Sequence, residues 1–88
     1  MVSKRVKVIN PLGLHMRPAQ LLVAEMARYD SDVTILFEGK TIDARNIMGL
    51  MASCVQMDSE IEICCEGPQE AEALKAAVRL VESGLGDL

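Results

Sequence analysis

The stretch EIEICCEGPQEAEALKAAVRLVESG, residues 60 to 84, indicates the class of fold more clearly than any other part of the chain. In its first part Ile61 and Ile63 alternate with glutamates, as in a strand that buries one face. A Gly-Pro pair then interrupts the extended chain. In the remainder apolar residues recur at helical spacing between charged ones, and Gly84 is placed to end the helix. We predict that the buried stripe of this helix consists of Ala71, Leu74, Val78 and Val81.

Three further strands are predicted upstream of this stretch. Residues 2–9 alternate between apolar and polar side chains, which is the pattern of a half-buried strand. Residues 33–37 and 40–44 are predicted to pair as a hairpin. Glu38 and Gly39 lie between them, and the glycine can supply the positive φ that a tight turn needs.

Two helices are predicted between these strands. The first is expected to begin at Pro18, since proline is well tolerated in a first turn, and to end at the polar run 29–32. The second is short and covers residues 46–52, where Asn46 is a good N-cap. The apolar spacing that predicts the first helix is that of Ala19, Leu22, Val23 and Met26.

The predicted order of elements is β-α-β-β-α-β-α along a chain of 88 residues. A chain of this length buries only about 60 to 65% of the surface that it exposes when unfolded, which suffices for one small domain. We therefore expect a single α+β domain over residues 1–88, in which helices cover one face of a mostly antiparallel sheet.

Composition and charge exclude one class of function. The net charge is -4, and residues 1–44 carry six basic and five acidic groups against three and eight in residues 45–88. No stretch combines clustered Lys and Arg with aromatic residues, and the chain has one Phe, one Tyr and no Trp. A nucleic-acid partner is therefore not expected.

Location and metal binding can also be addressed from the sequence. No apolar run approaches the roughly 20 residues of a membrane span, and the N-terminal residues form no apolar signal core, so we expect a cytoplasmic protein without membrane insertion. The cysteines, Cys54, Cys64 and Cys65, are odd in number and lack C-x-x-C spacing, which argues against a disulfide framework and against a zinc site. Cys64 and Cys65 would point to opposite faces of a strand. We expect no metal and no cofactor.

The only histidine lies in the segment GLHMRPA, residues 13–19, directly before the first predicted helix. The start of a helix offers backbone N–H groups without acceptors and the positive end of the helix dipole, and both favour a phosphate. Arg17 adds a planar fork of donors that suits phosphate oxygens. An imidazole is largely neutral near neutral pH, so His15 can act as a nucleophile through a ring nitrogen. Pro18 fixes the backbone where the helix starts. Spacing alone also allows the alternative that His15 only caps or packs near the helix.

Residues 13–19, taken with the segment NIMGLM at residues 46–51, resemble the HPr family of phosphocarrier proteins of the sugar phosphotransferase system. The likeness extends to the length, the order of elements, the turn at residues 38–40 and the final amphipathic helix. It implies an open-faced β-sandwich, in which a four-stranded antiparallel sheet carries three helices on one face.

The resemblance also implies a function for the histidine segment. In this family the histidine at the position of His15 accepts a phosphoryl group on Nδ1 from phospho-enzyme I, which obtains it from phosphoenolpyruvate. The phosphohistidine then passes the group to an enzyme IIA domain, and the residue at the position of Arg17 stabilises the phosphoryl group. Such a protein is a carrier in sugar transport and not an enzyme. A monomer is expected.

The family also implies an apolar patch beside the histidine that binds these partners. Methionine suits surfaces that accept several partners, although methionine at helical spacing is more common in cores. A short amphipathic helix can bury only one of its faces, so its outward residues would leave an exposed patch. The residues at the matching positions are Met16, Gln20, Ile47, Met48 and Met51.

This chain departs from the family pattern at several positions. Asn46 stands where many members of Gram-positive type carry a serine that an ATP-dependent HPr kinase phosphorylates. Asparagine can cap the helix but has no hydroxyl, so this regulatory position is not expected to be phosphorylated. Cys54 and Asp58 stand where the family usually has glycine, which is expected to alter the loop before the last strand. Met16 is bulkier than the residue common at its position.

Two other functions stay open at this point. The first is a carrier with the same His15 chemistry in a regulatory, nitrogen-type phosphorelay, in which phosphate controls other proteins instead of driving sugar uptake. The second is a pure interaction module in which His15 is never phosphorylated. The intact segment 15–18 argues against the second, because a scaffold would not need it.

Overall fold

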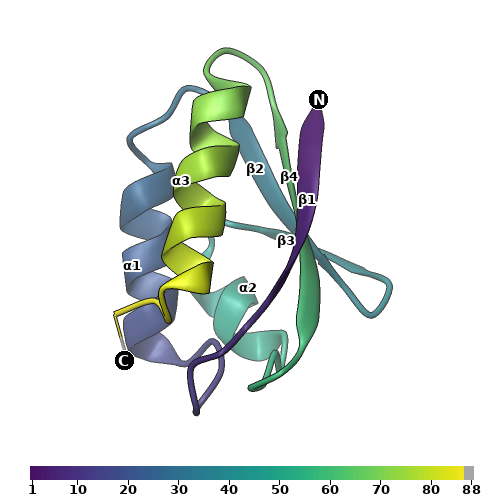
Figure 1. Ribbon diagram of the computed structural model, residues 1–88, viewed down its shortest axis with the longest axis vertical. Coiled ribbons are helices and arrows are strands. Elements are labelled where there is room, and N and C mark those ends of the chain that lie inside the picture. Colours follow the sequence, from purple (N-terminus) through teal and green to yellow (C-terminus); the bar gives the residue numbers. More distant parts are fainter. Residues whose placement is uncertain (87–88) are drawn as a thin grey trace.

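The computed structural model describes residues 1–86, and the elements follow the predicted order. The strands form one antiparallel sheet in the order β1-β4-β2-β3, and the three helices lie on one face of it (Figure 1). The predicted open-faced α+β sandwich is therefore confirmed. The elements are β1 (Val2–Lys7), α1 (Met16–Met26), β2 (Asp32–Phe37), β3 (Lys40–Asp43), α2 (Ile47–Ala52), β4 (Glu60–Glu66) and α3 (Glu70–Glu82).

The core lies between the sheet and the helices. Ile35 of β2 pairs with Ile63 of β4 and with Ile42 of β3, and all three side chains are buried. Their neighbours along each strand, among them Thr41, Asp43 and Glu62, point to the other face, which is more exposed to solvent. This separation is what the alternating sequence predicts, because successive side chains in a strand point to opposite faces.

The ends of α1 differ from the prediction. The helix begins at Met16 and not at Pro18, and His15 is its N-cap. Pro18 still lies in the first turn, where its missing N–H removes no hydrogen bond, so the helix can start before it. The carbonyl of His15 already accepts the amide of Ala19 at 3.0 Å. The helix ends at Met26, before the polar run at residues 29–32.

The buried stripe of α3 is shifted from the predicted one. Val78 and Val81 are buried as predicted, but Ala71 is exposed and Leu74 is only partly buried. The small side chains of Ala73 and Ala77 are fully buried instead, and they let the helix pack closely against its neighbours. Gly84 follows the helix with φ +90, which confirms its predicted role in ending it. Within residues 1–86, no helix has the length and the apolar character that crossing a bilayer requires.

The hairpin between β2 and β3 turns through two residues. Both Glu38 and Gly39 have positive φ, +48 and +77, as in the two-residue turns that match the twist of paired strands. The glycine was the predicted part of this turn. The left-handed conformation of Glu38 was not predicted, because non-glycine residues seldom adopt it.

Candidate functional site

A turn formed by residues 10–14 leads from β1 to His15. The amide of Gly13 donates to the carbonyl of Asn10 at 3.0 Å, and the side-chain amide of Asn10 donates to the carbonyl of Gly13. Asn10 is fully buried. The turn is therefore closed by two hydrogen bonds between the same two residues.

This turn rests against the loop that connects α2 to β4. The amide of Leu14 donates to the carbonyl of Val55 at 3.1 Å, and both side chains are buried. Gly13 has φ +66, and a Cβ at this position would lie 2.1 Å from the carbonyl oxygen of Val55. Only glycine satisfies both the backbone conformation and the available space.

The same loop also holds the end of β1. The amide of Val8 donates to the carbonyl of Ser59 at 2.9 Å, and the amide of Asp58 donates to the carbonyl of Val8 at 2.7 Å. These bonds replace regular strand pairing, which is why β1 ends at Lys7 and not at the predicted Ile9. The chain before His15 is thus attached to the α2–β4 loop on both sides of the turn.

His15 follows directly, in the extended conformation that N-cap residues adopt, with φ -83 and ψ -170. It is half-buried, and its side chain does not cap the helix. Arg17 is exposed in the first turn of α1, whereas Pro18 is buried and anchors that turn. The first turn contains no acidic side chain. The positive end of the helix dipole and the guanidinium can therefore both act on an anion held at His15.

The predicted partner patch is only partly exposed. Met48 and Met16 are 74% and 56% exposed, and Gln20 is exposed as well. Ile47 and Met51 pack against the core and are only partly exposed, so the outward face of α2 is formed mainly by Met48. The reason is the fully buried Leu50, which turns its helical neighbours toward the core as well.

The remaining exposed patch lies at one end of the molecule. Helices α1 and α2 pack against each other. The β1–α1 connection, the start of α1 and α2 lie at the same end (Figure 1). The exposed methionines of the two helices therefore belong to the end of the molecule that carries His15.

The structure adds two apolar residues to this end that the sequence analysis did not identify. Leu12 in the turn is 74% exposed, and Met57 in the α2–β4 loop is 49% exposed. With Pro11 and Gln56 they line a hollow of about 310 Å³. The available signal was a leucine placed in a turn between proline and glycine, where a polar residue is more usual.

Three positions that depart from the family pattern lie at the start of α2 and in the loop that follows it. Asn46 caps α2 as predicted, because its side-chain oxygen accepts the amide of Gly49 at 3.0 Å. Cys54 and Asp58 have φ +61 and +71, in the left-handed region that favours glycine. The α2–β4 loop therefore keeps a backbone that suits glycine although it carries two side chains there.

The buried cysteines occupy opposite faces of β4, as predicted. Cys65 pairs with Val2 and Val33 and is fully buried on the helix side, whereas Cys64 lies on the other face between Ser3 and Thr34. Burial is the main cause that raises the pKa of both thiols. Cys54 is exposed.

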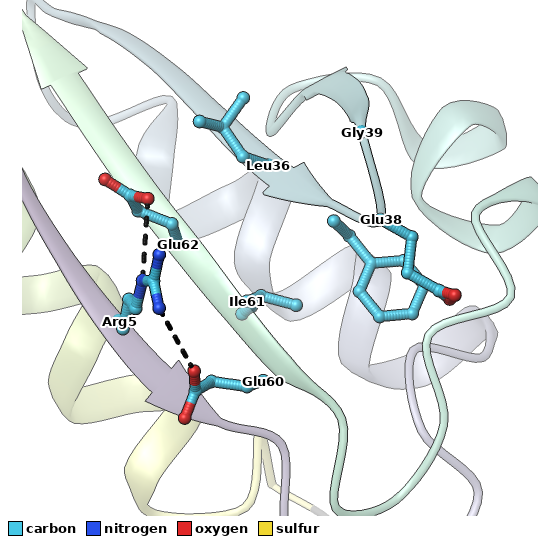
Figure 2. Close-up of a pocket in the computed structure, with 8 residues that line it drawn as sticks. Arg5, Leu36, Glu38, Gly39, Glu60, Ile61 and Glu62 are labelled. Carbon is cyan, nitrogen blue, oxygen red and sulfur yellow. Dashed lines mark ion pairs between the residues drawn. The ribbon is translucent and has the colours of Figure 1, made fainter.

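A second hollow, of about 280 Å³, lies on the face of the sheet that the helices leave open. Figure 2 shows Arg5 between Glu60 and Glu62, with ion-pair distances of 3.7 and 3.8 Å. These pairs join neighbouring strands β1 and β4 and are exposed to solvent. Such pairs are common on the solvated face of an antiparallel sheet. No residue of the histidine segment lines this hollow.

Comparisons with known proteins agree with the fold. The family model described as "PTS HPr component phosphorylation site" matches residues 2–83. The chain is 41% identical to the phosphocarrier protein HPr of Treponema pallidum over 83 residues, 94% of each chain. The chain therefore belongs to the HPr family of phosphocarrier proteins of the phosphotransferase system.

Solved structures extend this likeness to the whole chain. The structure of HPr-C-His from Thermoanaerobacter tengcongensis is similar with a TM-score of 0.94 and 34% identity, covering 100% of this chain and 99% of that one. A structure of the Bacillus subtilis catabolite repression protein Crh is similar with a TM-score of 0.78 and 38% identity, covering 96% and 97%. That Crh structure is described as a dimer with a swapped domain.

Proposed function

We propose that this protein carries a phosphoryl group on His15 from phospho-enzyme I to an enzyme IIA domain, in the course of sugar uptake. The position of His15 is the observation that carries the proposal. It is the N-cap of α1, and Arg17 lies in a first turn that contains no acidic side chain. In a member of the HPr family, this combination supports phosphorylation of that histidine.

The chemistry follows from the groups at the start of α1. A neutral ring nitrogen of His15, Nδ1 by resemblance to the family, attacks the phosphorus of the donor. The new N–P bond forms as the bond between phosphorus and the donor breaks, and the electron pair of the broken bond returns to the donor. Arg17 and the first amides of α1 stabilise the negative charge on the phosphoryl oxygens. Transfer to enzyme IIA restores His15, so the protein is a carrier and not an enzyme.

Pro18 supports this arrangement without contacting the phosphoryl group. It is buried in the first turn of α1, where its fixed φ suits the start of a helix. Because proline has no N–H, it leaves no donor unsatisfied in the buried part of the turn.

Both partners are proposed to bind the apolar end of the molecule around His15. Met16, Gln20 and Met48 supply the exposed part of this surface, and Ile47 and Met51 support it from the partly buried side of α2. Flexible methionines suit a surface that must accept enzyme I and enzyme IIA in turn. We expect the protein to act in the cytoplasm as a monomer.

A second candidate is a regulatory carrier with the same chemistry. The likeness to Crh, which is described as a catabolite repression protein, favours this alternative to sugar uptake. Incubation with enzyme I and IIA proteins of the sugar type and of the nitrogen type distinguishes the two, since only the true partners exchange phosphate rapidly.

The deciding experiment combines phosphoenolpyruvate, enzyme I and this protein, and measures intact mass. We expect one added phosphoryl group that is lost in acid, and no addition to the His15→Ala variant, which should remain folded by circular dichroism because His15 is only half-buried. Replacement of Arg17 by glycine should slow transfer without changing the fold. Acid-labile phosphate on His15→Ala, or none on the natural protein, would refute the proposal.

A further inference from the structure

We infer that Asn10 is a positioning residue of the phosphorylation site: its buried side-chain amide orients the peptide group that leads to His15. The inference rests on the proposed function, because it concerns the same histidine. Asn10 does not contact the phosphoryl group, and it acts through the turn at residues 10–14.

The first observation is the burial of Asn10. The residue is 0% exposed, and its side-chain nitrogen donates to the carbonyl of Gly13. Its side-chain oxygen has no hydrogen-bond partner, and within residues 1–86 it is the only buried side-chain polar atom of which this is true. An unsatisfied buried oxygen costs free energy, and an apolar residue would avoid that cost. Asparagine at this position is explained by the hydrogen bond that its nitrogen makes.

The second observation is the target of that hydrogen bond. The carbonyl of Gly13 and the amide of Leu14 belong to one planar peptide group. Asn10 holds the carbonyl, and the carbonyl of Val55 holds the amide at 3.1 Å. Both polar ends of this peptide group are therefore fixed, so its plane cannot rotate without breaking one of the two bonds.

This peptide group is close enough to His15 to set its direction. Only the backbone of Leu14 separates the two, and the Leu14 side chain is itself buried, with 3% exposure. The path continues into His15 at φ -83 and ψ -170, from which the imidazole leaves the chain. Gly13 cannot hold this path alone, because glycine is the most flexible residue. The amide of Asn10 supplies the missing restraint.

Orientation matters for a carrier because the reacting nitrogen must approach the phosphorus of a large partner along one direction. A misplacement of about 1 Å can slow a transfer by about a hundredfold. The partner patch is formed by other residues, so loss of the restraint should affect the transfer step more than partner binding.

The test compares three variants in single-turnover transfer from phospho-enzyme I. Asn10→Ala removes the donor, and Asn10→Asp keeps the shape but presents oxygens that cannot donate to the carbonyl of Gly13. Val81→Ala is the matched control, since Val81 is fully buried in α3, outside the turn. At a temperature where all three are folded, we expect both Asn10 variants to lower the maximal transfer rate about tenfold to a hundredfold. The KM for the protein should change little, and Val81→Ala should transfer at the natural rate.

Hydrogen exchange supplies a readout that does not depend on transfer. The amide of Leu14 should exchange faster in both Asn10 variants. Amides in the middle of α3 should exchange faster only to the extent that the variant lowers the global free energy of unfolding. Transfer by the Asn10 variants at the rate of Val81→Ala, or a loss confined to KM, would overturn the positioning role. If the natural protein accepts no phosphate, the proposed function fails separately, and unchanged exchange at Leu14 would then overturn the restraint itself.

Discussion

At the scale of single residues, the site depends on backbone conformations that few side chains tolerate. Gly13 has a positive φ and no space for a side chain. Cys54 and Asp58 also have positive φ in the α2–β4 loop, which supports the turn at residues 10–14, but both carry side chains. The loop therefore stores strain beside the turn that holds His15, and this strain can be measured.

Cys54→Gly should stabilise the protein by about 0.5–1 kcal/mol, because relief of about 1–2 kcal/mol of left-handed strain exceeds the entropy that glycine adds to the unfolded chain. Asp58→Gly should gain less, since aspartate tolerates this conformation better. Urea unfolding gives the free energies. Gly13→Ala is the opposite control and should be strongly destabilising, because its Cβ would lie 2.1 Å from the carbonyl oxygen of Val55. A less stable Cys54→Gly variant would contradict the strain assigned to this residue.

The three thiols should differ in reactivity. Cys54 is exposed, whereas Cys64 and Cys65 are buried and burial raises their pKa, which keeps them protonated. A thiol reagent at pH 8 should therefore label the folded protein once quickly and all the cysteines only after unfolding. Rapid labelling of Cys64 or Cys65 in the folded protein would contradict the burial.

The same shift predicts how stability depends on alkaline pH. The ordinary thiol pKa is 9.0, and the folded values of Cys64 and Cys65 lie above it. The unfolded chain therefore loses these protons first, so the contribution to stability is complete below 9.0 and is lost as pH rises through the folded values. Cys65→Ala should show a weaker fall in melting temperature above that pH than the natural protein.

At the scale of elements, α2 depends on its cap and on one anchor. A helix of six residues is too short to be stable alone. Asn46 satisfies the amide of Gly49, and Leu50 is fully buried. This explains how asparagine at position 46 keeps the helix capped.

Asn46→Ala should cost about 1 kcal/mol of stability because the cap is lost, whereas Asn46→Ser should be nearly neutral. With an ATP-dependent HPr kinase, we expect phosphate on Asn46→Ser and none on the natural protein, measured by phosphopeptide mass. Ser53 is only 3% exposed and its hydroxyl donates to the carbonyl of Leu50 at 2.6 Å, so the kinase should not phosphorylate Ser53 in place of residue 46. Phosphate on Ser53 of the natural protein would contradict this expectation.

The elements also indicate how far the sequence could be interpreted. Alternation and helical spacing predicted most strands and helices, because these patterns follow from which face is buried, whereas the short α2 was predicted from its N-cap Asn46 and its apolar residues. The start of α1 was missed, since proline is allowed at several positions of a first turn. The burial of Ile47 and Met51 depends on how α2 rotates against its neighbours, which its own sequence does not determine. Asn10 lies next to a Pro-Leu-Gly sequence that is typical of a turn, and only the tertiary structure reveals that it is buried.

At the scale of the whole molecule, the alternative to the expected monomer is a dimer in which two copies exchange β1. This strand lies at the edge of the sheet and pairs only with β4, which is the arrangement that permits exchange between copies. Exchange would require the turn after β1 to open, and opening would break both hydrogen bonds between Asn10 and Gly13. We therefore expect a single monomeric species in size-exclusion chromatography with light scattering across micromolar concentrations. A dimer that grows with concentration would contradict this.

The order of the strands also bears on how the chain folds while it is being synthesised. Strand β4 is the last strand to leave the ribosome, yet it lies between β1 and β2. Until residues 60–66 emerge, β1 has no strand to pair with, and among the strands only β2 and β3 can pair. Helix α3, which covers β1 and β4, follows at once. A nascent chain that stops before β4 contains His15 but cannot form the four-stranded sheet. The fold that positions His15 is therefore completed only in a late step, when β4 and α3 have been synthesised.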